Sequence, residues 1–179
     1  TIGACYMGHK LLGHEISTKK RHDFYLGSRF DNKEILDTIL DYNLNYYKSD
    51  NIYKDTAERL ASGKIVAWFQ GGAEFGPRAL GNRSILTKPY PAEMKDYLNK
   101  RVKFREPFRP YAPAVLKEYA NDYFNIEQES PHMLMAVQAK ENKKEKIAAT
   151  VHVDGSSRVQ TVEKENNFRF WKLLNAFYD

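Results

Sequence analysis

Cysteine is nearly absent from the sequence, and long apolar runs are absent altogether. Cys5 has no second cysteine with which to form an internal disulfide, so a disulfide framework is excluded and a reducing, cytoplasmic setting is expected. No Cys/His spacing typical of a zinc site occurs. No apolar run approaches the ~20 residues of a membrane helix, and no signal-peptide pattern is present, so no membrane partner is expected.

A strong charge imbalance is also lacking. The 179 residues carry 28 Lys plus Arg against 23 Asp plus Glu, a net charge of +5, and 42% are hydrophobic. This content fills the core of one domain with a small appendage. The mild basic excess permits an anionic ligand without specifying one, and solvated lysines such as those at 143–146 account for most of it.

The first 30 residues differ in character from the rest. Small residues and three glycines at positions 1–14 predict a helix end and a turn, and the opening Thr-Ile-Gly-Ala-Cys-Tyr suggests a fragment of a longer protein. Residues 15–30 are polar and predict a linker. The basic cluster at 19–22 is compatible with nucleic-acid contact. A solvent-exposed linker segment is favoured, because the cluster stands alone.

Residues 31–177 mix helical and strand patterns. Apolar spacing, a possible cap at Asp31 and a terminal glycine at Gly63 predict helices at 31–47, 52–62, from Pro91 onward, 118–124 and 168–177. Apolar runs predict strands at 64–70, 85–86, 114–116, 133–139, 147–153 and 159–162. The pattern favours an α/β (α+β) domain with a mixed sheet and flanking helices.

The glycine-rich stretch from Gly71 to Leu86, GGAEFGPRALGNRSIL, is the most informative part of the chain. Glycines allow a close approach to a ligand, Pro77 fixes the turn, and Arg78 then presents a fork of donors suited to phosphate or carboxylate. The alternative is that Arg78 only braces the turn against Glu74. Arg83 opens the next strand and is expected to be structural.

A second cationic stretch is KFREPFRPYAP, residues 103–113. Its prolines forbid a helix interior, so an extended backbone is expected, with the side chains of Lys103, Arg105 and Arg109 on one face. Phe104 and Phe108 would then turn into the core. A surface ion pair between Arg105 and Glu106 is an equal alternative to a ligand-binding role for Arg105.

The third stretch is DGSSRVQ, residues 154–160, whose small residues offer amides and hydroxyls beside Arg158. Three separate segments therefore supply Arg78, Lys103, Arg109 and Arg158, and cations that converge on one cleft suit a polyphosphate. His152 is a lone histidine on a predicted strand and is expected to be hydrogen-bonded structure, whereas His132, after Pro131, is expected to be a loop residue.

These blocks, in this order, resemble the C-terminal region of the O-carbamoyltransferases of the nodulation and antibiotic-tailoring type. FYLGSRF (24–30) and ESPHML (129–134) resemble the same family, so the likeness covers roughly residues 24–165. It implies a YrdC-like fold with a mixed twisted sheet over residues 24–179, with residues 1–23 as the end of an actin-like N-terminal lobe and a linker. The family's Asn-Thr-Ser-Phe-Asn segment does not follow before Asp179, which implies a truncated domain.

The resemblance also implies a chemistry. The C-terminal lobe would bind ATP, with Mg²⁺, and carbamoyl phosphate, and form carbamoyl-adenylate. Carbamate would attack the α-phosphorus and expel pyrophosphate, with Arg78 and Lys103 as catalytic residues, and with Arg78, Lys103, Arg109 and Arg158 binding the nucleotide and the carbamoyl group. No metal ligand is implied in this chain. Iron and transfer to a small-molecule acceptor hydroxyl belong to the absent N-terminal lobe, so the fragment alone would not transfer. The family implies a possible homodimer.

Two other functions remain open at this point. The basic cleft is compatible with RNA binding, although the chain lacks aromatic–glycine RNA signatures and its basic stretches are broken by acids, so nucleic acid is not expected. The domain is also compatible with a non-catalytic interaction role. The sequence does not specify the acceptor or the oligomeric state.

Overall fold

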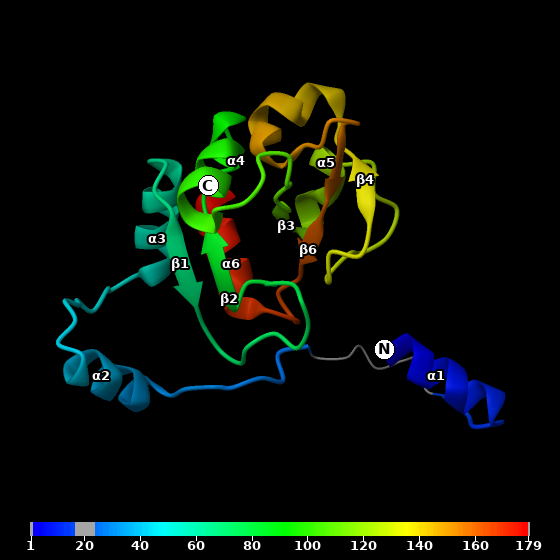
Figure 1. The fold of residues 1–179 in the computed structure, drawn as a ribbon, viewed down its shortest axis with the longest axis horizontal. Coiled ribbons are helices and arrows are strands. Elements are labelled where there is room, and N and C mark those ends of the chain that lie inside the picture. Colours follow the sequence, from blue (N-terminus) through cyan, green and yellow to red (C-terminus); the bar gives the residue numbers. More distant parts are fainter. Residues whose placement is uncertain (1, 17–23, 179) are drawn as a thin grey trace.

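The computed structural model describes residues 2–16 and 24–178. Helix α1 (Ile2–Leu11) lies apart from the other elements, and the large side chains of Met7 and Leu11 are exposed (Figure 1). A turn follows in which Gly13 has a φ of +78°, so the expected helix end and turn are present. The basic cluster at 19–22 and the expected domain boundary at residue 23 lie outside the described residues. No helix in the described part of the chain is long and apolar enough to cross a membrane.

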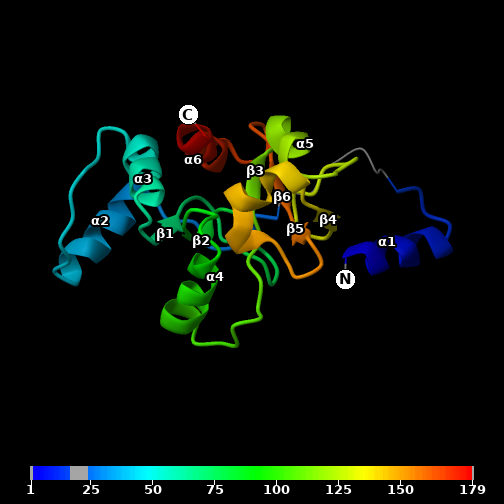
Figure 2. The ribbon, with the colours of Figure 1, turned by 90° about the horizontal axis from the view of Figure 1, so that it is seen from above.

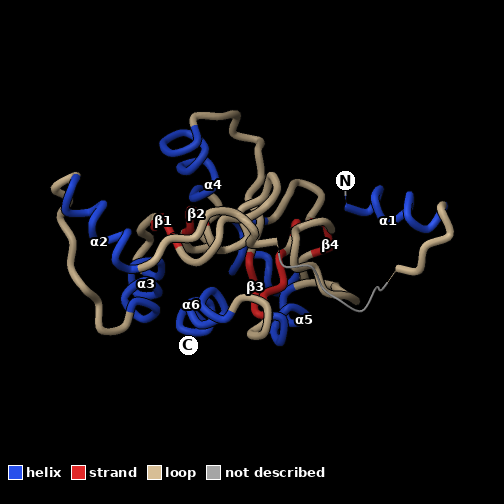
Figure 3. Tube along the Cα trace, turned by 90° about the horizontal axis from the view of Figure 1, so that it is seen from below, coloured by secondary structure: helices blue, strands red, loops and turns tan. Residues whose placement is uncertain are grey.

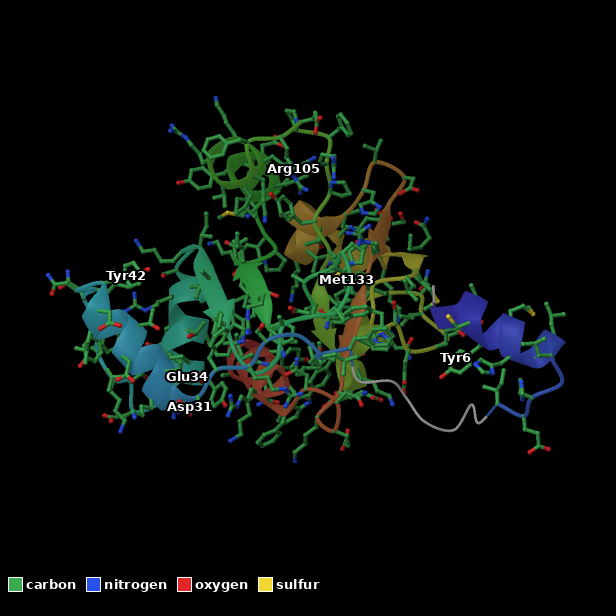
Figure 4. All side chains as sticks on the ribbon, turned by 60° about the horizontal axis from the view of Figure 1, so that its bottom comes forward. Tyr6, Asp31, Glu34, Tyr42, Arg105 and Met133 are labelled. Carbon is green, nitrogen blue, oxygen red and sulfur yellow. The ribbon has the colours of Figure 1, made fainter. Side chains whose placement is uncertain are left out.

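Helix α2 (Asn32–Asp41) begins as the sequence predicts and ends early. The Asp31 carboxylate accepts hydrogen bonds from the amides of Lys33 and Glu34, while the Glu34 carboxylate accepts from the Asp31 amide, which forms a capping box. The predicted end at Tyr47 is wrong, because Asn43 takes a left-handed conformation with a φ of +50°. None of the residues of α2 is buried, so tertiary packing does not stabilise further helical turns beyond Asp41 (Figure 4).

One core cluster joins the two ends of the folded region. Helix α3 (Ile52–Ala61) packs beside helix α6 (Phe168–Tyr178), and both cover the hairpin of β1 (Val66–Phe69) and β2 (Arg83–Leu86) (Figures 2 and 3). The hairpin is antiparallel, with Trp68 opposite Ser84. The buried side chains of this cluster are Leu60, Trp68, Val162, Phe170 and Leu173. The apolar spacing of both helices predicted these elements correctly.

The second half of the fold contains two further strand pairs. Strand β3 (Ala114–Leu116) pairs in parallel with β6 (Gln160–Val162), and β4 (Ala136–Gln138) pairs antiparallel with β5 (Ser156–Arg158). Helix α5 (Ala120–Tyr123) follows β3 after a 3₁₀ turn. The α+β class is confirmed, and parallel and antiparallel pairings both occur, but they are divided among three two-stranded ladders.

Two segments differ from the sequence-based expectations. The strand predicted at 147–153 is wrong, because residues 141–150 form 3₁₀ turns that bury Ile147 and Ala149, and the Ala149 amide donates to the Pro89 carbonyl at 2.8 Å. Helix α4 (Glu93–Leu98) continues into a π-helical turn, Asn99–Lys103, so Lys103 is not extended as predicted. The apolar composition of residues 147–153 correctly indicated buried side chains, but it did not indicate the backbone conformation.

Candidate functional site

The glycine-rich stretch forms a loop between β1 and β2 that is braced by one carboxylate. Oε1 of Glu74 accepts hydrogen bonds from the amides of Leu80, Asn82 and Arg83 at 2.6, 2.8 and 3.2 Å. Glu74 therefore braces the turn through the backbone and not through Arg78. Within the described residues the Arg78 side chain is exposed and makes no hydrogen bond or ion pair, so it is available to a ligand.

We expect Glu74→Ala to lower the free energy of unfolding by about 2–4 kcal/mol, because it leaves up to three partly buried amides without an acceptor. Glu74→Gln should cost about 1 kcal/mol, since a neutral acceptor remains. Urea unfolding monitored by the fluorescence of the two tryptophans, Trp68 and Trp171, measures both losses. Glu127→Ala, at an exposed carboxylate, is the matched control. Equal stability of Glu74→Ala and the control would contradict this role of Glu74.

Beneath the loop lies a network of buried amide side chains. The Gln70 Nε2 donates to the Oδ1 atoms of Asn82 and Asn167 at 2.8 and 2.7 Å. The Asn82 Nδ2 donates to the Gly72 carbonyl at 2.7 Å, and the Gln160 Nε2 donates to the Leu80 carbonyl at 3.0 Å. Strand β1, strand β6 and the start of α6 are thereby tied to the loop that carries Arg78. Nothing in the local sequence pattern identified these amides as partners.

Arg83 is structural, as the sequence predicts. Its guanidinium donates to four backbone carbonyls, including that of Gln70 at 2.6 Å and that of Ser28 at 3.0 Å. It also lies 3.6 Å from the centre of the Phe69 ring. All these contacts fix the loop to the β-hairpin and to the segment 24–28.

The segment after α4 departs most from the sequence-based expectation. Phe104 takes a left-handed conformation with a φ of +48°, and the side chains of Phe104 and Phe108 are 82% and 77% exposed. The prediction that both rings enter the core is therefore wrong, because the π-helical turn reverses the alternation of an extended strand. Arg109 pairs with Glu106 at 3.8 Å, so Glu106 meets Arg109 and not Arg105.

Arg105 faces inward on this segment (Figure 4). Its Nε donates to Oδ1 of Asn99 at 2.8 Å, and its guanidinium carbon lies 4.7 Å from the centre of the Tyr111 ring. Asn99 is 1% exposed. The Tyr111 hydroxyl is buried and makes no hydrogen bond of normal geometry. Its burial raises the pKa of Tyr111, against the opposing effects of the charge and the nearby donor of Arg105.

Arg158 lies on β5, opposite Ala136 of β4. Its Nε is buried and has no hydrogen-bond partner. Burial, followed by the charges of Arg78 and Arg105, lowers the pKa of the Arg158 guanidinium. Arg78 and Arg105 are thus each close enough to Arg158 to disfavour its charged form.

The turn before Arg158 satisfies its own polar groups. Oδ1 of Asp154 accepts from the amide and the hydroxyl of Ser156 at 3.0 and 2.7 Å, which lowers the pKa of Asp154. The Ser157 hydroxyl donates to the Thr150 carbonyl at 2.9 Å. The expectation that these hydroxyls are offered to a ligand is wrong, and Arg158 is what this turn presents. His152 is hydrogen-bonded as predicted through Nδ1, which lies 3.0 Å from Oγ of Ser156, while its buried Nε2 makes no hydrogen bond within the described residues.

An open cavity of about 1150 Å³ is lined by residues of β2, α4, β3, β6 and α6 and by residues from 143–150. Figure 1 shows where these elements lie in the fold. Nine basic residues and one acidic residue, Glu145, line the cavity. The basic residues are Arg78, Arg83, Lys88, Lys95, Lys103, Arg105, Lys143, Lys146 and Arg158. Three of the four predicted site residues, Arg78, Lys103 and Arg158, are brought together, whereas Arg109 does not belong to the lining. Arg105, for which the sequence left open a ligand-binding role or an ion pair with Glu106, also lines the cavity.

Comparison with known proteins points to one family. The family model described as "Carbamoyltransferase C-terminus" matches residues 57–179. The chain is 39% identical to nodulation protein NolO of Bradyrhizobium diazoefficiens, over 98% of this chain and 33% of that protein. It is 38% identical to nodulation protein NolNO of Sinorhizobium fredii, over 98% of this chain and 27% of that protein. It is 48% identical to nodulation protein U of Rhizobium tropici, over 67% of this chain and 21% of that protein.

The chain therefore spans about a third or less of the length of these relatives. The matched region contains every basic residue that lines the cavity. On this match, the chain belongs to the family of carbamoyltransferase C-terminal domains.

Proposed function

We propose that the cavity binds ATP and carbamoyl phosphate and forms carbamoyl-adenylate, within a carbamoyltransferase that passes the carbamoyl group to an acceptor hydroxyl. The observation that carries the proposal is the meeting of Arg78, Arg105 and Arg158 from three separate segments, with no ion pair to a carboxylate among the described residues. A cluster of uncompensated cations is stabilised by a ligand with several negative charges.

The cavity suits a reaction in which the nucleophile is already an anion. Water cleaves carbamoyl phosphate to carbamate and phosphate; a carbamate oxygen then bonds to the α-phosphorus of ATP, and the bond to the leaving pyrophosphate breaks. In the first step the protons of water leave with the phosphate. In the second step no proton has to be removed from carbamate, so the attack on ATP requires no general base. Among the described residues, the lining contains no histidine and a single carboxylate, Glu145, which agrees with catalysis by positioning and charge neutralisation.

Each cation has a proposed part in this reaction. Arg78 and Lys103 hold the α-phosphate and the carbamoyl oxygens, and Arg109 and Arg158 attract the polyphosphate and neutralise the departing pyrophosphate. Arg109 can join only if its contact with Glu106 breaks, and both side chains of that pair are more than half exposed, at 51% and 58%. An exposed pair contributes about 0–1 kcal/mol, so a triphosphate can displace Glu106.

Mg²⁺ is expected to arrive with ATP, and it would supply further neutralisation of the phosphate charge. Since Glu145 is the one carboxylate of the lining, the chain offers little direct coordination, and the phosphates themselves would carry the ion. The remaining parts of the proposal concern the longer protein. Residues 24–179 would form a YrdC-like domain that follows the end of an actin-like lobe. That lobe would hold iron and the acceptor site. The whole protein would be cytoplasmic and would form a homodimer.

The test is ATP–pyrophosphate exchange in the intact carbamoyltransferase that carries this chain. We expect exchange that depends on carbamoyl phosphate, and no carbamoylated acceptor from residues 24–178 alone. Salt-sensitive RNA binding without exchange would instead favour a nucleic-acid function. Calorimetry that detects no binding of ATP, AMP or carbamoyl phosphate by the intact protein would favour a non-catalytic role.

A further inference from the structure

We propose that Arg105 binds the anionic ligand of the cavity directly and that Asn99 is the residue that positions it. This inference rests on the proposed function for the identity of the ligand. The sequence left two interpretations of Arg105 open, a ligand-binding role and a surface ion pair with Glu106. Because Glu106 pairs with Arg109 instead, the ligand-binding role is the one that remains. The described structure leaves Arg105 without a carboxylate partner, on the lining of the cavity.

The Arg105 guanidinium is held on one edge and on one face. Nε donates to Oδ1 of Asn99 at 2.8 Å, and Nη2 makes a long contact of 3.4 Å with the Pro110 carbonyl. The Tyr111 ring covers a face of the guanidinium at 4.7 Å. Nη1 makes no hydrogen bond of normal geometry to another described residue, although the guanidinium lies close enough to the Tyr111 hydroxyl to act on its pKa. An arginine whose fork is already oriented loses little conformational freedom when an anion binds.

Asn99 holds the backbone that carries Arg105. Its Nδ2 donates to the carbonyls of Pro107 and Arg109 at 3.2 and 2.9 Å, and its carbonyl accepts from the Arg105 amide at 3.1 Å. These bonds close the segment that begins with the strained Phe104, whose φ of +48° is costly for a bulky residue. Strain and π-helical turns of this kind occur often at functional sites, where surrounding contacts enforce them.

Two unsatisfied donors lie on the same cavity. Only three buried side-chain polar atoms in the described residues lack a partner, and two of them, the Tyr111 hydroxyl and Nε of Arg158, belong to cavity-lining residues. Arg105 covers the Tyr111 ring and its charge acts on Arg158. Buried donors without acceptors are costly, and ligand oxygens at this place would satisfy them.

The experiment measures calorimetric binding of ATP and of inorganic pyrophosphate to the intact protein, with the KM for ATP in the exchange reaction. We expect Arg105→Lys, which keeps the charge and loses the fork, to weaken binding of both probes about tenfold or more. Asn99→Ala should weaken binding in the same direction. In the double variant the two losses should not add, because Asn99 acts through Arg105. Arg101→Lys, at an exposed position of the π-helical turn outside the cavity, should bind as the wild type does.

The outcomes separate the two proposals. Binding of pyrophosphate without ATP binding or exchange would reject the proposed function, and the Arg105 variants would still decide the present inference. Wild-type affinity in Arg105→Lys and Arg105→Ala would overturn it, whatever Asn99→Ala does. Additive losses of affinity in the double variant would reject the positioning role of Asn99. A wild-type protein that binds neither probe would reject both proposals.

Discussion

Arg158→Met is expected to lower carbamoyl-phosphate-dependent exchange by at least about 10²-fold and to leave the folded protein as stable as the wild type, or slightly more stable. Methionine fills a similar volume with an unbranched chain, and it removes both an unpartnered buried Nε and one of three neighbouring positive charges. Without ligand these features destabilise the fold, so their loss favours it. In the proposed reaction the Arg158 guanidinium neutralises the departing pyrophosphate, so its loss should slow the reaction.

The opposite signs of these two effects are what distinguish a binding residue from a structural one. Urea unfolding and exchange kinetics on the same preparation measure both. Arg83→Met supplies the contrast, because four carbonyls lose a donor, and both stability and activity should fall. Arg101→Met, outside the cavity, should change neither. A large loss of stability in Arg158→Met, or full activity, would contradict the assignment.

Arg78→Ala and Lys103→Ala should resemble Arg158→Met in abolishing exchange with the fold intact. Both side chains are exposed, line the cavity and make no hydrogen bond within the described residues. Their substitution therefore removes no intramolecular partner. The roles of all four cations remain predictions until such kinetics are measured.

Local signals in the sequence predicted the elements that local chemistry determines. Asp31 and Glu34 form the capping box, Gly63 ends its helix with a φ of +82°, and α6 follows its apolar spacing. The same signals located the turns that carry Arg78 and Arg158. In each case the residues that fix the backbone lie within a few positions of one another, so a short window contains the information.

Which side chains of residues 103–109 face the cavity depends on contacts that span more of the chain than a local sequence pattern covers. An extended chain would place Lys103, Arg105 and Arg109 together, but the left-handed Phe104 separates Arg109 from the cavity and keeps Arg105 in it. This conformation is held by Asn99, whose buried side chain bonds residues eight and ten positions later. An asparagine inside a helical pattern carries no local sign of that role.

The buried amides show the same limit over a longer range. Gln70 and Asn167 are bonded although they are 97 positions apart, and the bond positions the loop of Arg78. Their sequence neighbourhoods resemble ordinary strand and helix ends. Hence the sequence predicted which cations surround the cavity better than it predicted the polar residues that hold those cations in place.

Gly81→Ala is expected to lower the free energy of unfolding by roughly 3–5 kcal/mol, the largest loss of stability among the variants considered. Gly81 has a φ of +101°, which L side chains rarely adopt. A Cβ built there would lie 2.3 Å from Cδ1 of Phe170, a ring that is 1% exposed at the centre of the core. The ring cannot move without displacing α6, so the backbone of the loop must shift instead.

That shift should reach the cavity as well as the core. The Gly81 amide donates to Oγ of Ser84 at 3.0 Å, and the amides on either side of it donate to Glu74. Moving this backbone releases the brace that orients Arg78, so exchange activity should fall in the fraction that remains folded. Activity per folded molecule, with the folded fraction measured by urea titration, separates this effect from simple unfolding.

Gly76→Ala is the matched control in the same loop. Gly76 also has a positive φ, +136°, but nothing lies within 4 Å of the position its Cβ would occupy. Only backbone strain then acts, and we expect a loss of about 1 kcal/mol with little change in activity. Equal losses of stability in both variants would show that backbone strain alone accounts for the effect and that the Phe170 ring moves to make room for the added Cβ. Close packing of the loop on α6 would then not be what positions Arg78.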